Sequence, residues 1–545
     1  MKTFFKKARS LTMNNVLPFM AALSVVLGAS LFLLSCGAGK NAASNKSKVI
    51  NVGVTNDPAS LNPIATTNTM ANHAQSLLYL PLVAVNRDLG FDYRIAESIS
   101  TNDNKTFTIK IRQGVRWTDG KPVTADDVIF IYNVYTDPRV GRNNSDYNKV
   151  EGTDQAGLRP QGIDATAGFK KIDDYTVSVT LKYPITQNVF NLTLGTACPL
   201  PKHIYENVPP ENLRSHPPLF SPQVTNGPFK YKEYVPGQYI SYVRNDDYYL
   251  GPPKIDAFNF KILTGAQITA QLESGEIDMN FAYVGAIPAE DYDRVQRMEH
   301  LRTFLDKPIG VQVLYFNCEF INNVKVRQAM DLAIDREGIY KNILKERGYL
   351  TKVPWTYRIE YFNEEASKYE YNPEKAKRLL AESGWDLNKR IVFAVPTGDT
   401  TRERVANILL ESFKGIGLNN IVIEKADYAT TLSNVQHNKY ELSIVAMPEI
   451  PLNQIYYLRV YGSQRWTWTN FQNPRGDELL NIIETSIDPG TLKNAYYELE
   501  QLIADEVSAV CVYSLLPLNA VNKRVVQGEI PHYGPLLEIH QWDVE

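Results

Sequence analysis

The stretch DNKTFTIKIRQGVRWTDGKPVTADDV, residues 103–128, joins a strand, a turn and the start of a helix without interruption. Residues 105–112 alternate apolar and polar side chains, which predicts a half-buried strand. Asp119–Gly120 predicts a turn, and Thr124 is placed to cap a helix that begins directly after it. This order of elements indicates a mixed α/β protein.

Further elements follow from periodicity along the rest of the chain. Alternating or continuous apolar runs predict strands at 49–54, 175–181, 391–395, 421–423 and 441–447. Helical spacing predicts helices at 326–344, 373–383 and 402–415, the second of them between the cap Asn372 and the stop Gly384. Strand, helix and strand between 391 and 423 predict a βαβ unit.

Several short motifs accompany residues 103–128. In chain order they are DPASLNP at 57–63, NGPFK at 226–230, RNDDYY at 244–249, SGEID at 274–278, VRQAM with AIDR at 326–336, and YNPEKAKRLLAESGW at 371–385. In this order they resemble the large solute-binding proteins of peptide, nickel and oligosaccharide ABC importers, the oligopeptide-binding family. Tyr249 stands where that family usually has Trp. Most motif residues supply turns and core, so the signature identifies the fold rather than the ligand.

The resemblance implies an α/β periplasmic-binding-protein-like fold (type II, cluster C), with two lobes around a cleft and an extra third domain. The lobes would close on a ligand by a hinge motion. The expected division is lobe I at 49–95, 205–305 and 506–545, accessory domain II at 96–204, and lobe III at 306–505.

The N-terminus reads as a targeting segment that ends at Cys36. Basic residues between 2 and 9 precede the uncharged run 16–34, and Leu33-Leu34-Ser35-Cys36 resembles the bacterial lipobox. A transmembrane helix is the alternative, because the run is long enough to span a bilayer. The small, polar residues 37–48 suit a flexible tether and favour lipidation. We therefore expect a signal peptide at 1–35, a lipidated tether at 36–48, and a cell-membrane anchor on the extracytoplasmic side.

Composition excludes some classes of protein. The formal net charge of −3 argues against a general nucleic-acid surface, which requires clustered positive charge. Cys198, Cys318 and Cys511 lack the spacing of a metal knuckle and read as structural, buried thiols, although one distant pair remains open.

The ligand-contacting segment expected from the resemblance is 441–474. Glu449 is the sharpest candidate, since a buried peptide ammonium requires a carboxylate partner, and an exposed loop Glu is the alternative. Trp466 and Trp468 would share one face of a strand, to stack on a ligand or to pack in the core. Met447 and Asn470 flank them in the same segment.

Weaker candidates lie elsewhere along the chain. Trp355 and Tyr357 repeat the alternating aromatic pattern after Pro354, and Asn56, Asn68 and Tyr315 come from strand ends near the expected cleft.

Catalytic and metal motifs are missing from the sequence. It contains no HExxH, GxSxG or P-loop pattern, and none of the 7 histidines pairs at helical spacing. We expect a protein that is not an enzyme and has no cofactor and no metal site.

The family resemblance implies capture of oligopeptides outside the membrane and delivery to ABC permease subunits, and we expect a monomer. An oligosaccharide ligand is the alternative within the family, and the aromatic content favours it. A lipoprotein receptor or adhesin is the alternative from another class, and a surface hydrolase lacks a supporting nucleophile and base.

Overall fold

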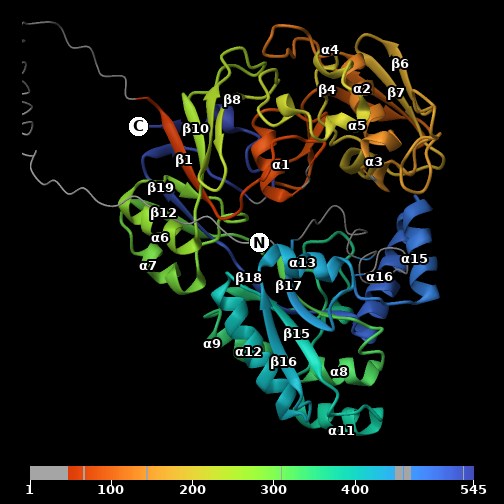
Figure 1. Cartoon of the computed structure of the whole chain (residues 1–545), viewed down its shortest axis with the longest axis vertical. Helices are drawn as coiled ribbons and strands as arrows, with labels where there is room; N and C mark the ends of the chain where they lie inside the picture. Colours follow the sequence, from red (N-terminus) through yellow and green to blue (C-terminus); the bar gives the residue numbers. More distant parts are fainter. Residues whose placement is uncertain are drawn as a thin grey trace, which may run out of the picture. The chain divides into compact units, whose positions relative to one another are not determined.

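The computed structural model describes residues 47–65, 68–142, 145–308, 310–448, 458, 468–531 and 533–545. Ser47–Glu545 form one compact unit, separate from Met1–Lys46. Sheets of seven, six and four strands carry this unit (Figure 1). Within the described ranges, each helix is too short or too polar to cross a membrane.

The seven-stranded sheet has β1 near its centre, with a parallel neighbour on each side. In spatial order its strands are β12 (Leu301–Leu305), β19 (Leu518–Asn522), β11 (Met279–Asn280), β1 (Val49–Val54), β10 (Ala257–Ile262), β9 (Tyr239–Arg244) and β8 (Phe229–Val235). The strand expected at 49–54 is confirmed. The elements packed beside this sheet are α1 (Thr69–Ser76), α6 (Gly265–Ser274), α7 (Tyr292–Gln296) and the pair β20 (Val525–Gln527) and β21 (Asp543–Val544).

The four-stranded antiparallel sheet contains the segment 103–128 that opened the sequence analysis. Its strands, in order, are β4 (Ala96–Thr101), β5 (Thr106–Ile111), β7 (Thr176–Thr180) and β6 (Phe169–Asp173). The predicted strand and helix are both confirmed, since α2 (Ala125–Thr136) begins directly after Thr124, whose backbone N donates to Asp127 at 2.9 Å. The shorter elements around it are β2 (Val83–Val85), β3 (Phe91–Tyr93), α3 (Gln187–Thr193), α4 (Lys202–Tyr205) and α5 (Pro210–Leu213).

The six-stranded sheet contains the predicted βαβ unit. Its strands, in order, are β14 (Gly348–Tyr349), β18 (Ala509–Leu515), β13 (Gly310–Phe316), β17 (Leu442–Pro448), β15 (Ile391–Pro396) and β16 (Ile421–Ala426). β15 pairs with β16 in parallel, and α12 (Thr400–Gly415) connects them, which confirms the prediction. β17 is also parallel to β15, so three strands of this sheet share one direction.

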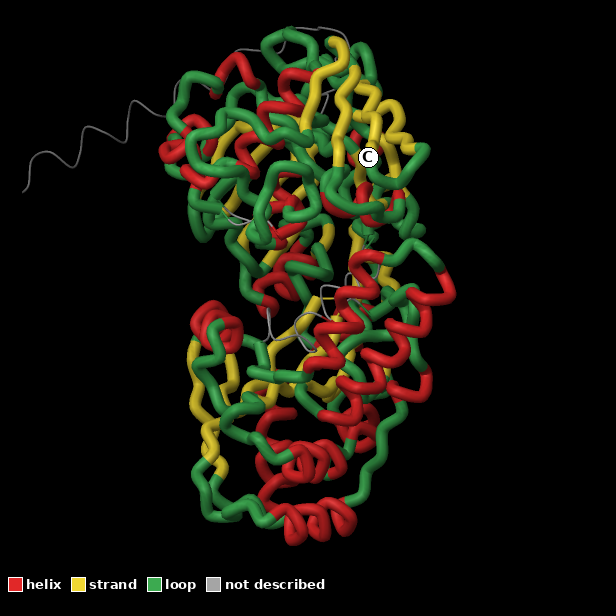
Figure 2. The backbone as a smooth tube through the Cα atoms, turned by 90° about the vertical axis from the view of Figure 1, so that its right-hand side faces the viewer, coloured by secondary structure: helices red, strands yellow, loops and turns green. Residues whose placement is uncertain are grey.

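Both faces of the six-stranded sheet are apolar and covered by helices. Adjacent residues of a strand point to opposite faces, so Leu314 joins one buried cluster and Val313 the other. The first cluster includes α8 (Val324–Leu332), α9 (Arg336–Asn342), α11 (Pro373–Ser383) and α12, and the second includes α10 (Glu364–Ser367), α13 (Tyr428–Gln436), α15 (Pro474–Thr485) and α16 (Pro489–Glu506). The pair α15 and α16, at the right of Figure 1, faces the viewer in Figure 2.

The single helix expected at 326–344 is wrong, because the chain breaks it between α8 and α9. Asp335 caps α9 by accepting the backbone N–H of Gly338 at 2.8 Å. The fully buried Arg336 then turns into the core, where it donates to Cys511 O at 2.8 Å and to Asp331 at 2.6 Å. A buried guanidinium requires such partners, and this requirement overrides the helical periodicity.

The chain passes between the two large sheets after β12 and returns after β18. The two connections lie side by side, since Asp306 N donates to Pro517 O at 2.9 Å. The expected boundary at 505/506 falls before β18, whereas the change of sheet comes at 516–517. Two short adjacent connections are the arrangement that a hinge requires.

Three cysteines lie in the described residues, and all three are free thiols, so no disulfide joins them. Cys511 is buried, whereas Cys198 and Cys318 keep part of their surface exposed. Burial of the thiol nevertheless raises the pKa of Cys198 to about 12 and that of Cys318 to about 11. Protonated thiols of this kind fit the structural role predicted from the sequence.

Candidate ligand-binding site

The parallel strands of the six-stranded sheet end together at one edge. β15, β16 and β17 end at Pro396, Ala426 and Pro448, and their shared direction places these carboxyl ends on the same side. Open α/β sheets bind ligands in the crevice outside the carboxyl ends of their strands. We call residues 397–402, 427–428 and 446–448 the second edge.

A buried arginine organises the second edge. Arg402, in the first turn of α12, is only 7% exposed; its Nε donates to Gln312 at 2.9 Å and its Nη2 to Asp399 at 3.1 Å. Its guanidinium also lies 5.4 Å from the ring centre of Tyr428. These partners offset the cost of burying the charge and fix a cation beside the strand ends.

The seven-stranded sheet has an equivalent edge, because β10 and β11 run parallel to β1. The segment after β1 contains the exposed Asn56, followed by Asp57. Asp57 accepts hydrogen bonds from the hydroxyl of Tyr234 and from Gly237 N, the latter at 2.6 Å. These bonds attach the β8–β9 hairpin to the end of β1. We call residues 55–57, 263–264 and 281–283 the first edge.

The aromatic rings of Phe281 and Tyr283, in the first edge, pack against a histidine of α1. The ring of His73, on α1, is centred 4.5 Å from Phe281 and 6.1 Å from Tyr283. Burial lowers the pKa of His73 to about 4, so the imidazole is neutral near pH 7. Its Nε2 is buried without a hydrogen-bond partner in the described part of the chain.

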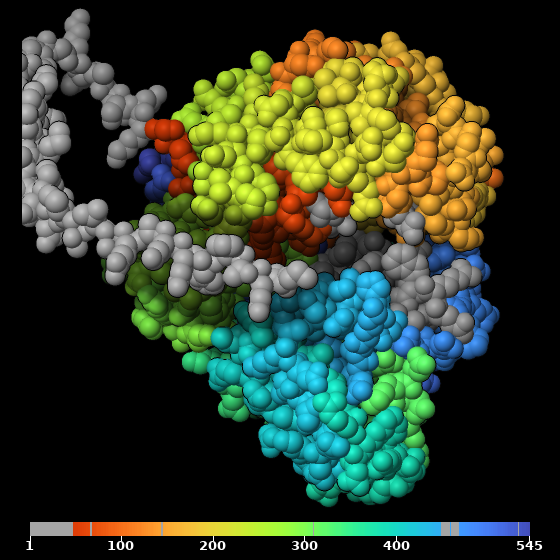
Figure 3. Space-filling model, viewed as in Figure 1, coloured from red at the N-terminus to blue at the C-terminus, as the bar shows by residue number. Residues whose placement is uncertain are grey.

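The second edge contacts the segment of the chain that follows the first edge. Thr400, in the first turn of α12, donates its hydroxyl to Glu290 at 2.8 Å. Burial raises the pKa of Tyr283, and Tyr428 of the second edge adds to this rise. Arg347 and Asp293 form a further ion pair beside the connections, where Arg347 O accepts from Leu516 N at 3.0 Å. Figure 3 shows the green and the cyan parts of the chain in contact. The space outside both sets of strand ends is therefore the candidate ligand-binding site.

Four candidates from the sequence share one apolar cluster on the six-stranded sheet. Tyr315, Met447 and Trp355 are almost fully buried there, and Trp468 is half-buried against them. The rings of Tyr315 and Trp468 are 6.1 Å apart. In this conformation the first three contact the core, and Trp468 alone of the four keeps a sizeable surface.

The expected alternation of Trp355 and Tyr357 is wrong. Both lie in a turn region rather than in a strand, and Trp355 is 2% exposed whereas Tyr357 is 49% exposed. The expectation that Trp466 and Trp468 share one face assumed that both lie in a strand. Trp468 does not lie in a strand.

Two of the three asparagine candidates, Asn68 and Asn470, have structural partners. Asn68 caps α1 by accepting from Ala71 N at 2.7 Å, and it donates to Pro58 O at 2.9 Å. Asn470 has a positive φ of 51° and donates to Asn317 and Glu319, each at 3.2 Å. Both side chains therefore fix loops next to strand ends.

Three predicted residues, Cys36, Glu449 and Trp466, lie outside the described residues. The last described residue before Glu449 is Pro448, the final residue of β17 at the second edge.

Sequence reasoning missed Arg402, Tyr428 and Gln312. A signal was present, because Asp399 and Asp427 follow predicted strands and cap the next helices. An acidic helix N-cap that follows a parallel strand indicates the carboxyl end of that strand, and the residues next to the cap line the edge of the sheet. Across the described ranges, no three His, Cys, Asp or Glu side chains gather in an arrangement that could hold a metal ion.

Comparison with known proteins adds to this geometry. Residues 91–468 match the bacterial extracellular solute-binding proteins, family 5 (middle region). The oligopeptide-binding protein AppA of Bacillus subtilis is 28% identical over 528 residues, covering 90% of this chain and 92% of AppA. The solved structure of that AppA with a nonapeptide superposes with a TM-score of 0.79 at 25% identity, covering 92% of this chain and 100% of AppA. NikZ of Campylobacter jejuni with Ni(L-His) has the same fold, with a TM-score of 0.76 at 20% identity over 91% of this chain and 99% of NikZ.

Proposed function

Because the chain belongs to the family 5 bacterial extracellular solute-binding proteins, we propose that it captures oligopeptides between the first and second edges and delivers them to an ABC importer. The observation that carries this proposal is that both large sheets end in an edge of parallel strands and are joined by two adjacent connections. The nonapeptide held by AppA supports a peptide ligand.

The physical case for a peptide rests on polar matching. A ligand enclosed between two lobes loses its water, so each backbone amide and each terminal charge requires a partner. Extended peptides meet this need through backbone hydrogen bonds that tolerate many side chains. Strand ends offer such backbone groups on both edges.

Terminal charges require charged partners. We assign the peptide α-amino group to Glu449, which follows directly after β17 and would place a carboxylate at the second edge. The half-buried Trp468, from the same segment of the chain, would contact a peptide side chain. Tyr315, Met447 and Trp355 would pack beneath this site. Asn68 and Asn470 would fix the loops beside it.

The lobes follow the sheets in this proposal. The seven-stranded sheet carries lobe I, the four-stranded sheet carries the accessory domain, and the six-stranded sheet, including β18, carries lobe III. The connections at 306–308 and 516–517 then act as the hinge.

Location completes the proposal. Lipidation of Cys36 after removal of residues 1–35 would attach a monomer to the outer side of the cell membrane, with residues 36–48 as a tether. The tether would leave the lobes free to close on a ligand and to dock on permease subunits. The protein would act by binding alone, without catalysis.

The decisive experiment is mass spectrometry of ligand released from freshly purified, denatured protein. A mixture of short peptides is the expected result. A defined glycan without peptide would replace the proposal with the oligosaccharide alternative, and a nickel chelate would also overturn it.

A further inference from the structure

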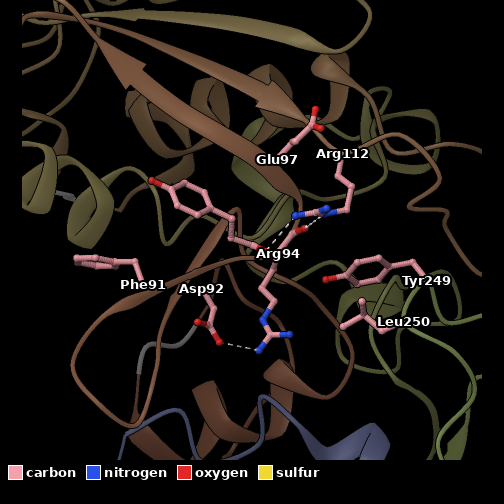
Figure 4. Close-up of a pocket in the computed structure, with 8 residues that line it drawn as sticks. Phe91, Asp92, Arg94, Glu97, Arg112, Tyr249 and Leu250 are labelled. Atoms are coloured by element: carbon pink, nitrogen blue, oxygen red, sulfur yellow. Dashed lines mark hydrogen bonds and ion pairs between the residues drawn. The ribbon is translucent and has the colours of Figure 1, made fainter.

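A second pocket lies away from the two edges, at the junction of the seven- and four-stranded sheets. Its volume is about 420 Å³, within the range of small-molecule sites. The residues that line it are Phe91, Asp92, Tyr93, Arg94, Glu97, Arg112, Tyr249 and Leu250 (Figure 4). All of them precede the crossing at 306–308, so this pocket does not depend on closure of the lobes.

An irregularity in the β4–β5 pairing positions the charged residues Glu97 and Arg112 in this pocket. The β4–β5 ladder shifts register between Ala96 and Ser98, which leaves Glu97 exposed outside the regular pairing. Arg112 follows β5 directly, and its backbone N donates to Ile95 O at 2.8 Å. Both side chains therefore emerge at the same end of the ladder (Figure 4).

Arg94 lies in the wall of the pocket and pairs with two carboxylates. The side chain of Arg94 is 5% exposed, and its Nη2 donates to Asp92 at 3.2 Å and to Glu538 at 2.8 Å. Its Nε is buried and has no hydrogen-bond acceptor in the described residues. Among the described residues, this N–H group of the wall is therefore an unsatisfied hydrogen-bond donor.

Arg112 and Glu97 are the charges available to a ligand. Arg112 is oriented by backbone carbonyls, because its Nε donates to Arg94 O at 3.1 Å and its Nη2 to Tyr93 O at 3.5 Å. Among the described residues, neither Arg112 nor Glu97 takes part in an ion pair. Arg112 and Glu97 are thus one cation and one anion of the lining that have no ion-pair partner in the part of the chain that the structure describes.

Apolar groups complete the lining. Phe91, Tyr93 and Tyr249 supply aromatic rings, and Leu250 is 44% exposed. The Tyr249 ring packs against Tyr248 at 5.0 Å between centres, which fixes its orientation. Rings beside opposite charges suit a ligand that is both zwitterionic and aromatic.

We propose that this pocket binds an aromatic α-amino acid. The ligand carboxylate pairs with Arg112, the ammonium pairs with Glu97, and the side chain lies among the rings and Leu250. Each half of the zwitterion alone would leave one charge of the pocket unpaired, so the free amino acid is preferred over its deaminated and decarboxylated analogues.

The test is saturation-transfer NMR on the full chain in detergent, with L-phenylalanine as the probe. 3-Phenylpropionate and phenethylamine serve as analogues that lack the ammonium and the carboxylate. The variants are Glu97→Gln and Arg112→Gln, with Arg116→Gln as the matched control. Arg116 is exposed outside the pocket, and Nη1 donates to Gly120 O at 3.0 Å.

We expect at least tenfold weaker binding of L-phenylalanine in each pocket variant and unchanged binding in Arg116→Gln. Glu97→Gln should also abolish the preference for L-phenylalanine over 3-phenylpropionate. Glu97 is exposed, so this variant keeps the fold even if Arg112→Gln does not. Equal binding of all three compounds, binding that survives Glu97→Gln, or no binding of L-phenylalanine at all would overturn the proposal.

Discussion

Replacing Arg336 by Met removes the charge that holds the break between α8 and α9. The Arg336 side chain is 0% exposed, and its partner Asp331 is 6% exposed. The guanidinium also donates to Cys511 O at 2.8 Å, so the substitution leaves a buried carboxylate and a buried carbonyl without this donor. Breaking a buried pair on one side costs about 3–5 kcal/mol.

That cost has a measurable size in thermal unfolding. A unit as large as the six-stranded part loses about 2–4 °C per kcal/mol, so Arg336→Met should lower Tm by about 6–20 °C. Differential scanning calorimetry measures this directly. Arg378→Met, at an exposed position of α11, is the matched control and should change stability by less than about 0.5 kcal/mol.

A second substitution separates the ion pair from simple packing. Asp331→Asn in the Arg336→Met background removes the carboxylate that has lost Arg336 and should restore part of the lost stability. Lys352 Nζ lies 3.5 Å from Asp331 Oδ2, so the carboxylate keeps one cationic partner in Arg336→Met. This partner limits how much stability Asp331→Asn can restore. A Tm loss below about 2 °C in Arg336→Met would refute the reasoning.

Three other predictions concern binding, pH and location. Glu449→Gln should weaken oligopeptide affinity at least tenfold, about 1.4 kcal/mol, in calorimetric titration; unchanged affinity would remove Glu449 from the amine-binding role. Burial lowers the pKa of His73 from its usual 6.5 to about 4. As the pH falls, the unfolded state therefore binds a proton at His73 before the folded state does. Up to about 3 kcal/mol of folding stability should be lost between pH 6.5 and 4. His73→Phe should flatten that part of the Tm–pH curve, and a curve parallel to the wild type would contradict the assignment. Cys36→Ala should abolish incorporation of a labelled fatty acid into the protein, whereas a wild-type protein that carries no label would favour the transmembrane alternative.

The strands and the βαβ unit were predictable from sequence because their signals are local. Alternation at 105–112 and the apolar runs at 49–54 and 391–395 specify burial within a few residues. The break at 333–335 was not predictable in this way. It depends on Arg336 finding Cys511 O, a partner 175 residues further along the chain.

The candidate site was only partly predictable for the same reason. The strand expected at 441–447 and Asn56 were placed near strand ends, and in the structure the end of β17 and Asn56 lie at the edges. Tyr315, Met447 and Trp355 gave the same aromatic and apolar signal as ligand contacts, yet they lie in the core. Composition does not distinguish these roles, whereas the parallel pairing of β15, β16 and β17 identifies the edge and with it Arg402.

Hydrogen–deuterium exchange with and without the peptide released from the purified chain tests the central claim most directly. If the ligand binds between the two edges, bound peptide protects backbone amides at 55–57 and 281–283 and also at 397–402 and 427–428. The segments that line the second pocket, 91–97 and 249–250, should exchange at unchanged rates. Protection on one edge alone, or at neither edge, would contradict the account.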